Sequence, residues 1–318
     1  MHYRGAVRAF AHDDVTYPLP EGHRFPLGRY RRLRERVERW PGVEVRPSRA
    51  ATGAELLHAH TPAYLARAVA GDLSPRERAA LGLPWSPELV ERARRSVGAT
   101  LQAADVALRH GVAANLGGGT HHAFPDAGRG FCMFNDVVCA VRTLRAAGRV
   151  GHVLVVDLDV HQGDGTHAAL AGSEQATCLS VNGGRNYPFR RVPGDLEADL
   201  ADGTGDDAYL DVVADLLDRA LRRARPDLCI YLAGADPYRG DRLGRLALTR
   251  PGLRARDVLV RDTMAACGVP VCVTLAGGYA DPISDTVDIN AATLAVFARL
   301  DPAAVGGTGT EDAAAPVP

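Results

Sequence analysis

The chain has 318 residues, of which 46% are hydrophobic and 24% charged, as is usual for a globular protein with a large core. Its 37 Lys and Arg residues balance 38 Asp and Glu residues, so no overall charge favours nucleic acid or an anionic membrane surface as a partner. The N-terminus lacks the basic start and apolar core of a signal peptide, and no apolar run approaches the length of a membrane span.

The first predicted helix covers residues 30–40. Tyr30, Leu33, Val37 and Trp40 share one face of it, and glutamates lie among its arginines. This arrangement favours a core stripe under a solvated face over a basic nucleic-acid helix.

A second helix is predicted to begin with Ser86 as N-cap and Pro87 in the first turn, and to end at Gly111. Its buried stripe consists of Leu89, Ala93, Val97, Leu101, Ala104 and Leu108. Further helices are expected at residues 207–224 and 254–266, and strands at residues 112–116, 152–158, 176–181, 227–232 and 269–275. Because strands alternate with helices, the pattern predicts an α/β domain whose parallel sheet is covered on both faces. Residues 301–318 are rich in Ala, Gly and Pro without periodicity, and we expect a disordered tail there.

The cysteine pattern indicates a reducing compartment. Six cysteines lie mostly in apolar surroundings, and no two form a CxxC pair. Buried, reduced thiols in a cytoplasmic protein are therefore favoured over disulfides or a thiolate metal site.

Four of the predicted strands are followed by small residues and then by reactive groups. In open α/β sheets ligands bind at the carboxyl edge, so we expect these segments to converge on one site. The segments read GGGTHHAFPDAGRGFCMFND, DLDVHQGDGTH, GADPYRGDRLGRLALT and AGGY.

The second segment carries a candidate metal site. Asp157, Asp159 and His161 are two residues apart, so on an extended chain they point to the same side. Buried carboxylates are costly unless a cation or strong hydrogen bonds compensate, although a hydrated strand end is the simpler reading of Asp-x-Asp alone. A catalytic zinc-type site needs three protein ligands and a free position for water. Asp159 and His161 supply two, and Asp236 is the candidate for the third.

His121 and His122 are candidates for proton transfer to and from such a site. Asp157 and Asp164, which are not needed as ligands, could fix the tautomers of the two imidazoles. Tyr279 could donate a hydrogen bond to a developing oxyanion. Taken singly, the histidine pair reads as a hydrated loop and Tyr279 as an ordinary aromatic at a strand end.

These segments resemble, in order and approximate spacing, the signature segments of the zinc-dependent histone deacetylase family. The match runs from about residue 24 to the helix after Asn290. The resemblance implies the arginase–deacetylase fold, with a single domain over residues 1–300 and a central, mostly parallel sheet of about eight strands. Family resemblance also implies an N-acyl amine as substrate, either an acylated lysine or a small acylated amine, and no nucleic-acid or membrane partner.

The resemblance assigns roles to individual residues. Asp159, His161 and Asp236 would hold zinc, or ferrous iron in vivo. His121 and His122 would be the general base and acid, supported by Asp157 and Asp164 respectively, and Tyr279 would polarise the scissile carbonyl. Gly130 and Phe131 would line the acyl-lysine tunnel, with Cys132 alongside. A structural potassium ion would be bound by main-chain carbonyls of Asp157, Asp159 and His161, together with Ser180 and Val181.

The departures from the family pattern are informative. Gln162 stands where many members carry a second histidine, and it makes the chain look closest to the class IV branch and its bacterial relatives. Ala276 replaces a glycine before Tyr279, and Pro237 follows Asp236, but neither removes a catalytic group. Residues 81–87 contain no acid where class I enzymes carry one to grip the substrate backbone, which argues against histone-like peptides.

Two other functions compete with a deacylase. A ureohydrolase on the same fold would use two manganese ions and an Asp-x-Asp motif, whereas residues 233–237 of this chain contain the single acid Asp236, which favours one metal. A non-catalytic binder of acylated ligands should have lost a ligand, a histidine or Tyr279. All are present, so an enzyme is favoured.

Overall fold

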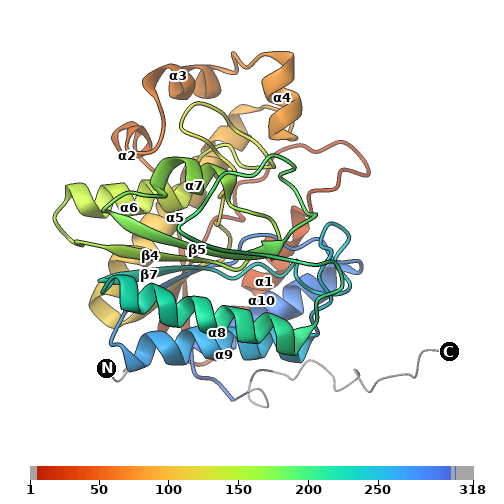
Figure 1. Ribbon diagram of the computed structural model, residues 1–318. Helices are drawn as coiled ribbons and strands as arrows, with labels where there is room; N and C mark the ends of the chain where they lie inside the picture. Colours follow the sequence, from red (N-terminus) through yellow and green to blue (C-terminus); the bar gives the residue numbers. More distant parts are fainter. Residues whose placement is uncertain (1–5, 302–304, 306–318) are drawn as a thin grey trace.

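The computed structural model describes residues 6–301 and residue 305. Its centre is an eight-stranded sheet in the order β2-β1-β3-β8-β7-β4-β5-β6, in which every described pair of neighbouring strands is parallel (Figure 1). The strands are β1 (Val7–Ala11), β2 (Val43–Pro47), β3 (Val112–Asn115), β4 (Val153–Asp157), β5 (Ala176–Gly183), β6 (Leu196–Leu200), β7 (Leu228–Leu232) and β8 (Val271–Thr274). The predicted α/β class and parallel sheet are confirmed.

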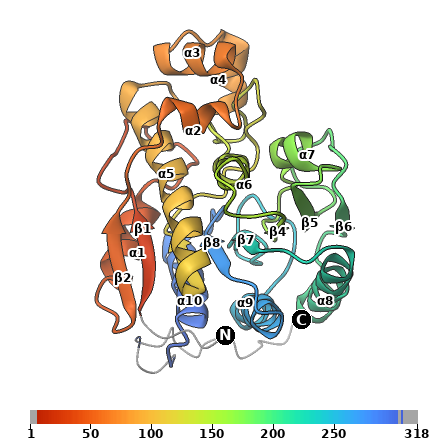
Figure 2. The same ribbon diagram turned by 90° about the vertical axis from the view of Figure 1, so that its left-hand side faces the viewer.

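Helices cover both faces of the sheet, as Figure 2 shows from the end of the strands. The helices are α1 (Gly28–Val37), α2 (Gly53–Leu57), α3 (Pro62–Ala70), α4 (Pro75–Leu81), α5 (Pro87–His110), α6 (Asp136–Ala146), α7 (Asp164–Leu170), α8 (Asp206–Arg223), α9 (Arg250–Ala266) and α10 (Ile283–Phe297). Helices α1, α8, α9 and α10 pack on one face, and α5, α6 and α7 on the other. Each layer encloses its own apolar core, so the sheet is buried on both sides.

Local sequence signals explain where the helices begin and end. The Ser86 hydroxyl accepts a hydrogen bond from the Leu89 N–H at the start of α5, and Gly111 ends the helix with a φ of 93°. Helix α9 begins at Arg250, four residues before the prediction, because Thr249 caps it. Helix α1 buries Leu33 and Val37 as predicted.

Five strands were predicted close to their observed bounds, while β1, β2 and β6 were not predicted. The described residues contain no helix long and apolar enough to cross a membrane. The predicted tail at residues 301–318 lies, apart from Asp301 and Val305, outside the described residues.

Neighbouring strands β3, β8, β7 and β4 form the middle of the sheet, and their carboxyl ends lie at one edge. The loops that follow them carry His121 and His122, Tyr279, Asp236 and Asp159 respectively. The sheet therefore brings together four segments that are far apart in the sequence.

Candidate metal centre and active site

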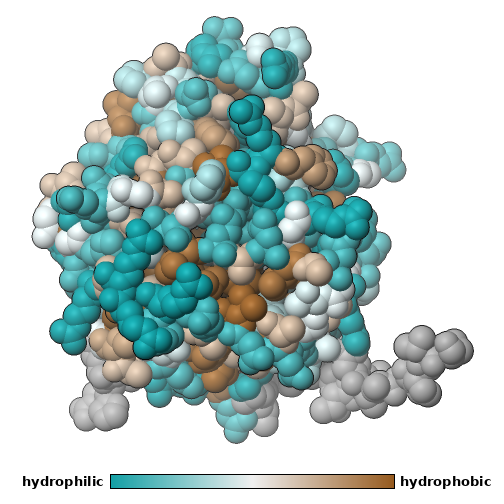
Figure 3. Space-filling view, viewed as in Figure 1, coloured by the Kyte–Doolittle hydropathy of each residue, from teal (hydrophilic) through white to brown (hydrophobic). Residues whose placement is uncertain are grey.

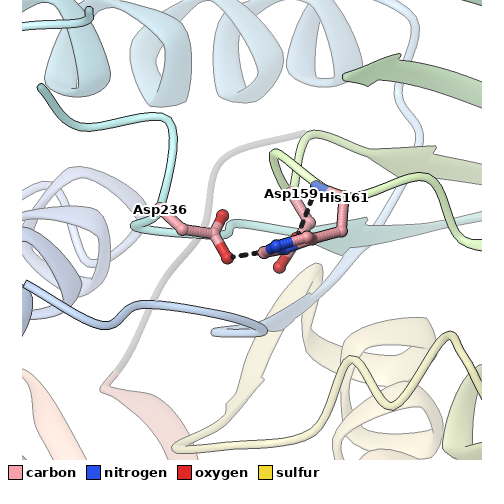
Figure 4. Close-up of side chains that lie close together, drawn as sticks. All are labelled: Asp159, His161 and Asp236. Carbon is pink, nitrogen blue, oxygen red and sulfur yellow. Dashed lines mark hydrogen bonds and ion pairs between the residues drawn. The ribbon is translucent and has the colours of Figure 1, made fainter. Parts of the chain in front are cut away.

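Asp159, His161 and Asp236 form a compact cluster at the carboxyl edge. Asp159 and His161 follow β4, and Asp236 follows the adjacent strand β7, with Asp157 and Leu232 in register at the two strand ends. One ligand atom from each residue lies within 4.8 Å of the others, and the side chains point toward one another (Figure 4). All three residues are buried.

Backbone amides hold the two carboxylates. Asp159 Oδ2 accepts from the Gly277 N–H at 2.7 Å, and Asp236 Oδ1 accepts from the Val160 N–H at 2.9 Å. His161 Nδ1 faces the carboxylates, 3.0 Å from Asp159 Oδ1 and 3.3 Å from Asp236 Oδ2. Asp236 Oδ2 is fully buried and, although His161 Nδ1 lies 3.3 Å away, it accepts no hydrogen bond, which is costly for a carboxylate unless a cation is bound.

The charges of the cluster also suit a divalent cation. Burial and the nearby Asp159 raise the pKa of Asp236, whereas the two carboxylates outweigh burial and raise the pKa of His161 to about 10. Two buried carboxylates thus repel each other and share one imidazole as their neutralising partner. A divalent ion on these oxygen and nitrogen ligands would relieve that repulsion, and the donor set fits zinc or ferrous iron.

Gly277 leaves the space in which such an ion would be held. A Cβ atom at this position would lie 1.9 Å from Asp236 Oδ2 and 2.6 Å from Asp159 Oδ2. Gly277→Ala should therefore displace both carboxylates and lower metal affinity about 10- to 100-fold, as loss of a supporting contact does in metal sites. A zinc titration against a competing chelator would measure the change.

Gly53→Ala is the matched control for this substitution, because a Cβ at Gly53 meets nothing within 4 Å. It should bind zinc as the wild type does. Equal zinc affinity in Gly277→Ala and the wild type would contradict the placement of the ion beside Gly277.

The two histidines lie beside the cluster, each paired with a carboxylate. His121 Nδ1 lies 2.7 Å from Asp157 Oδ2, and His122 Nδ1 lies 2.7 Å from Asp164 Oδ1. Because a carboxylate only accepts, each Nδ1 carries a proton, so Nε2 is the nitrogen of each ring at which a proton can be exchanged. The ring centroids of the pair are 4.2 Å apart.

The surroundings of the two imidazoles shift their pKa values in opposite directions. Burial alone would lower the pKa of His121, but Asp157 and Asp159 outweigh it and raise the value to about 9. Burial and the neighbouring His121 lower the pKa of His122 to about 4. His122 is therefore neutral at pH 7 and can accept a proton.

Tyr279 closes the site from the segment after β8. Its ring centroid is 6.4 Å from that of His161 and 6.1 Å from that of Phe131. Burial raises the pKa of Tyr279 well above its ordinary value, so the phenol stays protonated and can donate a hydrogen bond.

Asp241 and Arg29, to which the sequence had given no role, hold the segment of Tyr279. Asp241 Oδ2 accepts from the Tyr279 N–H at 2.5 Å. The buried Arg29 of α1 donates to the carbonyl oxygens of Ala276, at 2.5 Å, and Gly278, at 2.8 Å. These contacts join parts of the chain about 250 residues apart.

Arg256 makes a similar link between the two loops that carry the candidate metal ligands. Its guanidinium is fully buried, pairs with Asp257, and donates to the carbonyl oxygens of Gly234 at 2.6 Å and Leu158 at 3.4 Å. Gly234 lies two residues before Asp236, and Leu158 directly precedes Asp159. Sequence patterns had not identified this contact either, because one arginine in an amphipathic helix usually faces solvent.

Gly130, Phe131 and Tyr187 form the walls beside His122. A Cβ at Gly130 would lie 2.6 Å from His122 Cδ2, and the backbone there has a φ of 52°, so glycine fits this position best. The Tyr187 ring packs edge-on against His122 with centroids 4.8 Å apart. Tyr187 had not been predicted as a wall. Cys132 lies alongside, its thiol 3.3 Å from the Gly130 carbonyl oxygen.

Gln162 has a positioning role in this structure. Its side-chain amide donates to the Val192 carbonyl oxygen and accepts from the Val192 N–H, both at 3.0 Å, and it also contacts Glu197. It therefore anchors the loop between β5 and β6 that carries Tyr187.

The predicted potassium ligands lie on β4, on β5 and in the loop after β4. Ser180 and Asp157 are in register on the two strands, and Ser180 and Val181 are fully buried. The potassium site stays a prediction.

Comparisons with known proteins agree with the fold. Residues 23–294 match the family model described as histone deacetylase domain. An uncharacterized protein of Picosynechococcus sp. is 41% identical over 280 residues, 87% of this chain and 93% of that protein. The histone deacetylase-like amidohydrolase of Pseudomonas aeruginosa is 31% identical, over 75% of this chain and 67% of that protein.

Solved structures show the same fold. A histone deacetylase homologue from Aquifex aeolicus has a TM-score of 0.80 and 24% identity, over 93% of this chain and 85% of that one. A crystal structure of a homologue complexed with SAHA has a TM-score of 0.81 at 24% identity, over 94% of this chain and 85% of that one. The fold and the family match define a hydrolase of the arginase–deacetylase type. The chain belongs to the histone deacetylase family.

Proposed function

We propose that this hydrolase removes an acetyl or longer acyl group from an N-acylated lysine or related small amine. Asp159, His161 and Asp236 would hold one divalent ion, zinc or ferrous iron. When bound, the ion polarises the amide carbonyl and makes water nucleophilic near neutral pH. The observation that carries the proposal is the buried Asp-His-Asp cluster, with one orphaned carboxylate oxygen, beside two His–Asp pairs and a buried phenol.

Proton transfer is assigned to the histidine pair. Nε2 of His122 accepts the proton of the attacking water and returns it to the departing amine, a role supported by its lowered pKa. Asp164 keeps the proton on Nδ1 and so keeps Nε2 available. His121, held by Asp157 and with its pKa raised to about 9, is protonated near neutral pH and supplies positive charge beside the reacting carbonyl.

Tyr279 and the walls orient the substrate. The Tyr279 hydroxyl donates a hydrogen bond to the carbonyl oxygen as negative charge develops on it. Gly130 and Phe131, together with Tyr187, line the tunnel for the chain that bears the amide. A potassium ion on Asp157, Asp159, His161, Ser180 and Val181 would brace the loop of the metal ligands.

The competing functions have less support. Two manganese ions would require a second set of acids, and the described residues contain one cluster of candidate ligands, with Asp236 as the only acid in residues 233–237. A non-catalytic binder has no need of two buried His–Asp pairs. A class IV-like relationship and a cytoplasmic location belong to the proposal, and the latter is supported by six free cysteine thiols.

Metal removal tests the proposal directly. Purified protein should contain about one zinc or iron ion per chain, as expected for three protein ligands. Complete chelation should abolish hydrolysis of N-acyl-lysine substrates, and added zinc should restore it. Elemental analysis and a panel of acyl chain lengths, with a hydroxamate inhibitor as control, would measure both effects. Two ions per chain, or full activity after chelation, would contradict the proposal.

A further inference from the structure

The outer opening of the active site is strongly cationic. This opening is a depression of about 680 Å³, lined near its rim by the side chains of Arg24, Arg185, Arg242 and Arg245, and by no Asp or Glu among the described residues. All four arginines are exposed. The chain as a whole has a formal net charge of −1, so this concentration of positive charge is local.

Nearby carboxylates compensate only part of this charge. Arg185 and Arg245 share one acid, Asp202, at 3.5 and 3.2 Å. Arg242 reaches Asp281 only at 4.0 Å, and the Asp281 side chain is 73% exposed. These pairs are weak in water, so most of the positive potential remains at the opening.

Arg24 increases the excess of positive charge. Within the described part of the chain, no Asp or Glu forms an ion pair with Arg24. The end of α4 contributes Ala79, Ala80, Leu81 and Gly82 to the same rim, without an acid. A basic peptide would therefore be repelled here, and an anion attracted.

The arginines line the region that the amine side of a bound substrate would occupy. His122, Phe131 and Tyr279 line both the opening and an adjoining inner cavity of about 90 Å³. The inner cavity has room for an acyl group, so the amine side of the substrate extends into the opening. Arg242 is tied to the site, because its Nε donates to the Tyr279 carbonyl oxygen at 3.3 Å.

We propose that the physiological substrate carries a carboxylate on the amine side of the scissile amide, and that Arg24 and Arg242 select it at the rim. This inference rests on the proposed deacylase function and names its substrate class. The exposed ring of Phe189 lies at the same opening and would cover the apolar stem between amide and carboxylate.

Matched substrates that differ in one charge test this inference. We expect the zinc-loaded protein to hydrolyse Nα-benzoyl-Nε-acetyl-lysine with a free α-carboxylate about three- to tenfold more efficiently, in kcat/KM, than its α-carboxamide at low salt. The ratio should fall as salt is added. Acetyl-lysine peptides flanked by Asp or by Asn distinguish a side-chain carboxylate from a terminal one.

The double variant Arg24→Gln, Arg242→Gln should bring the ratio close to one. Arg109→Gln is the matched control. Arg109 is a half-exposed arginine with an ion-pair partner, and it lies at the end of α5, near the amino ends of the strands and away from the site. This variant should keep the wild-type ratio. A ratio of one in the wild type, or an unchanged ratio in the double variant, would overturn the inference.

Binding separates this inference from the proposed function. Two hydroxamates that differ only in an outer carboxylate or carboxamide should show the same preference in Kd, whether or not any amide is cleaved. If neither lysine substrate is hydrolysed but the charged hydroxamate binds more tightly, the proposed function fails and the rim assignment stands. If both substrates are hydrolysed equally and both hydroxamates bind equally, the rim assignment alone fails.

Discussion

Asp236→Ala should lose the bound metal and lower kcat/KM by more than about a thousandfold, because it removes one of three protein ligands. The change also relieves the repulsion between the buried carboxylates of Asp159 and Asp236, which offsets the loss of the Val160 N–H hydrogen bond. The metal-free variant should therefore unfold at a temperature close to that of the metal-free wild type. Elemental analysis, kinetics and thermal unfolding of the two proteins would measure the three effects.

Two further variants sharpen this test. Asp236→Asn keeps an oxygen for the Val160 N–H, and should be folded but metal-poor. Asp211→Ala removes an exposed acid on α8 with no role in the site and should keep both metal and activity. Zinc retained at full occupancy in Asp236→Ala would remove this residue from the ligand set.

Tyr279→Phe should lower kcat about 30- to 1,000-fold, equivalent to about 2–4 kcal/mol of transition-state stabilisation, with the metal retained. The phenol is buried and protonated, so it can donate to a developing oxyanion without first losing solvent. Because the ring contacts to His161 and Phe131 survive the change, substrate affinity should change little. Steady-state kinetics and metal analysis would separate the two contributions.

Tyr64→Phe provides the matched loss of one buried hydroxyl. Tyr64 lies on α3, away from the candidate metal ligands, and its hydroxyl donates to the Met133 carbonyl oxygen at 2.8 Å. This variant should lose about 1 kcal/mol of stability but keep kcat. Wild-type kcat in Tyr279→Phe would show that the oxyanion is held by other groups.

The middle of the sheet could be predicted from the sequence, but its edges could not. Strands such as β4 and β7 are apolar along most of their length because both of their faces are buried. Strands β2 and β6 lie at the two edges and carry charged residues, and β1 contains Arg8, whose guanidinium pairs with Glu44 on β2. Short runs of this kind resemble loops in sequence.

In the site, too, some residues could be predicted from the sequence and others could not. The motif residues could be found because each follows a strand end at a fixed spacing, as with Asp159 and His161. The supporting residues could not, because their partners are distant in sequence: Arg29 binds the carbonyls of Ala276 and Gly278, and Arg256 binds that of Gly234. Such contacts have no local pattern and follow only from the assembled sheet.

The contact of Arg29 with Ala276 and Gly278 has a consequence for how the protein matures. During synthesis α1 leaves the ribosome long before the segment after β8, so for most of translation Arg29 is a cation without its two carbonyl acceptors. An unpaired guanidinium resists burial, and α1 therefore cannot dock firmly until the last strand is in place. Hydrolytic competence should thus arise late and all at once, rather than growing as successive strands join.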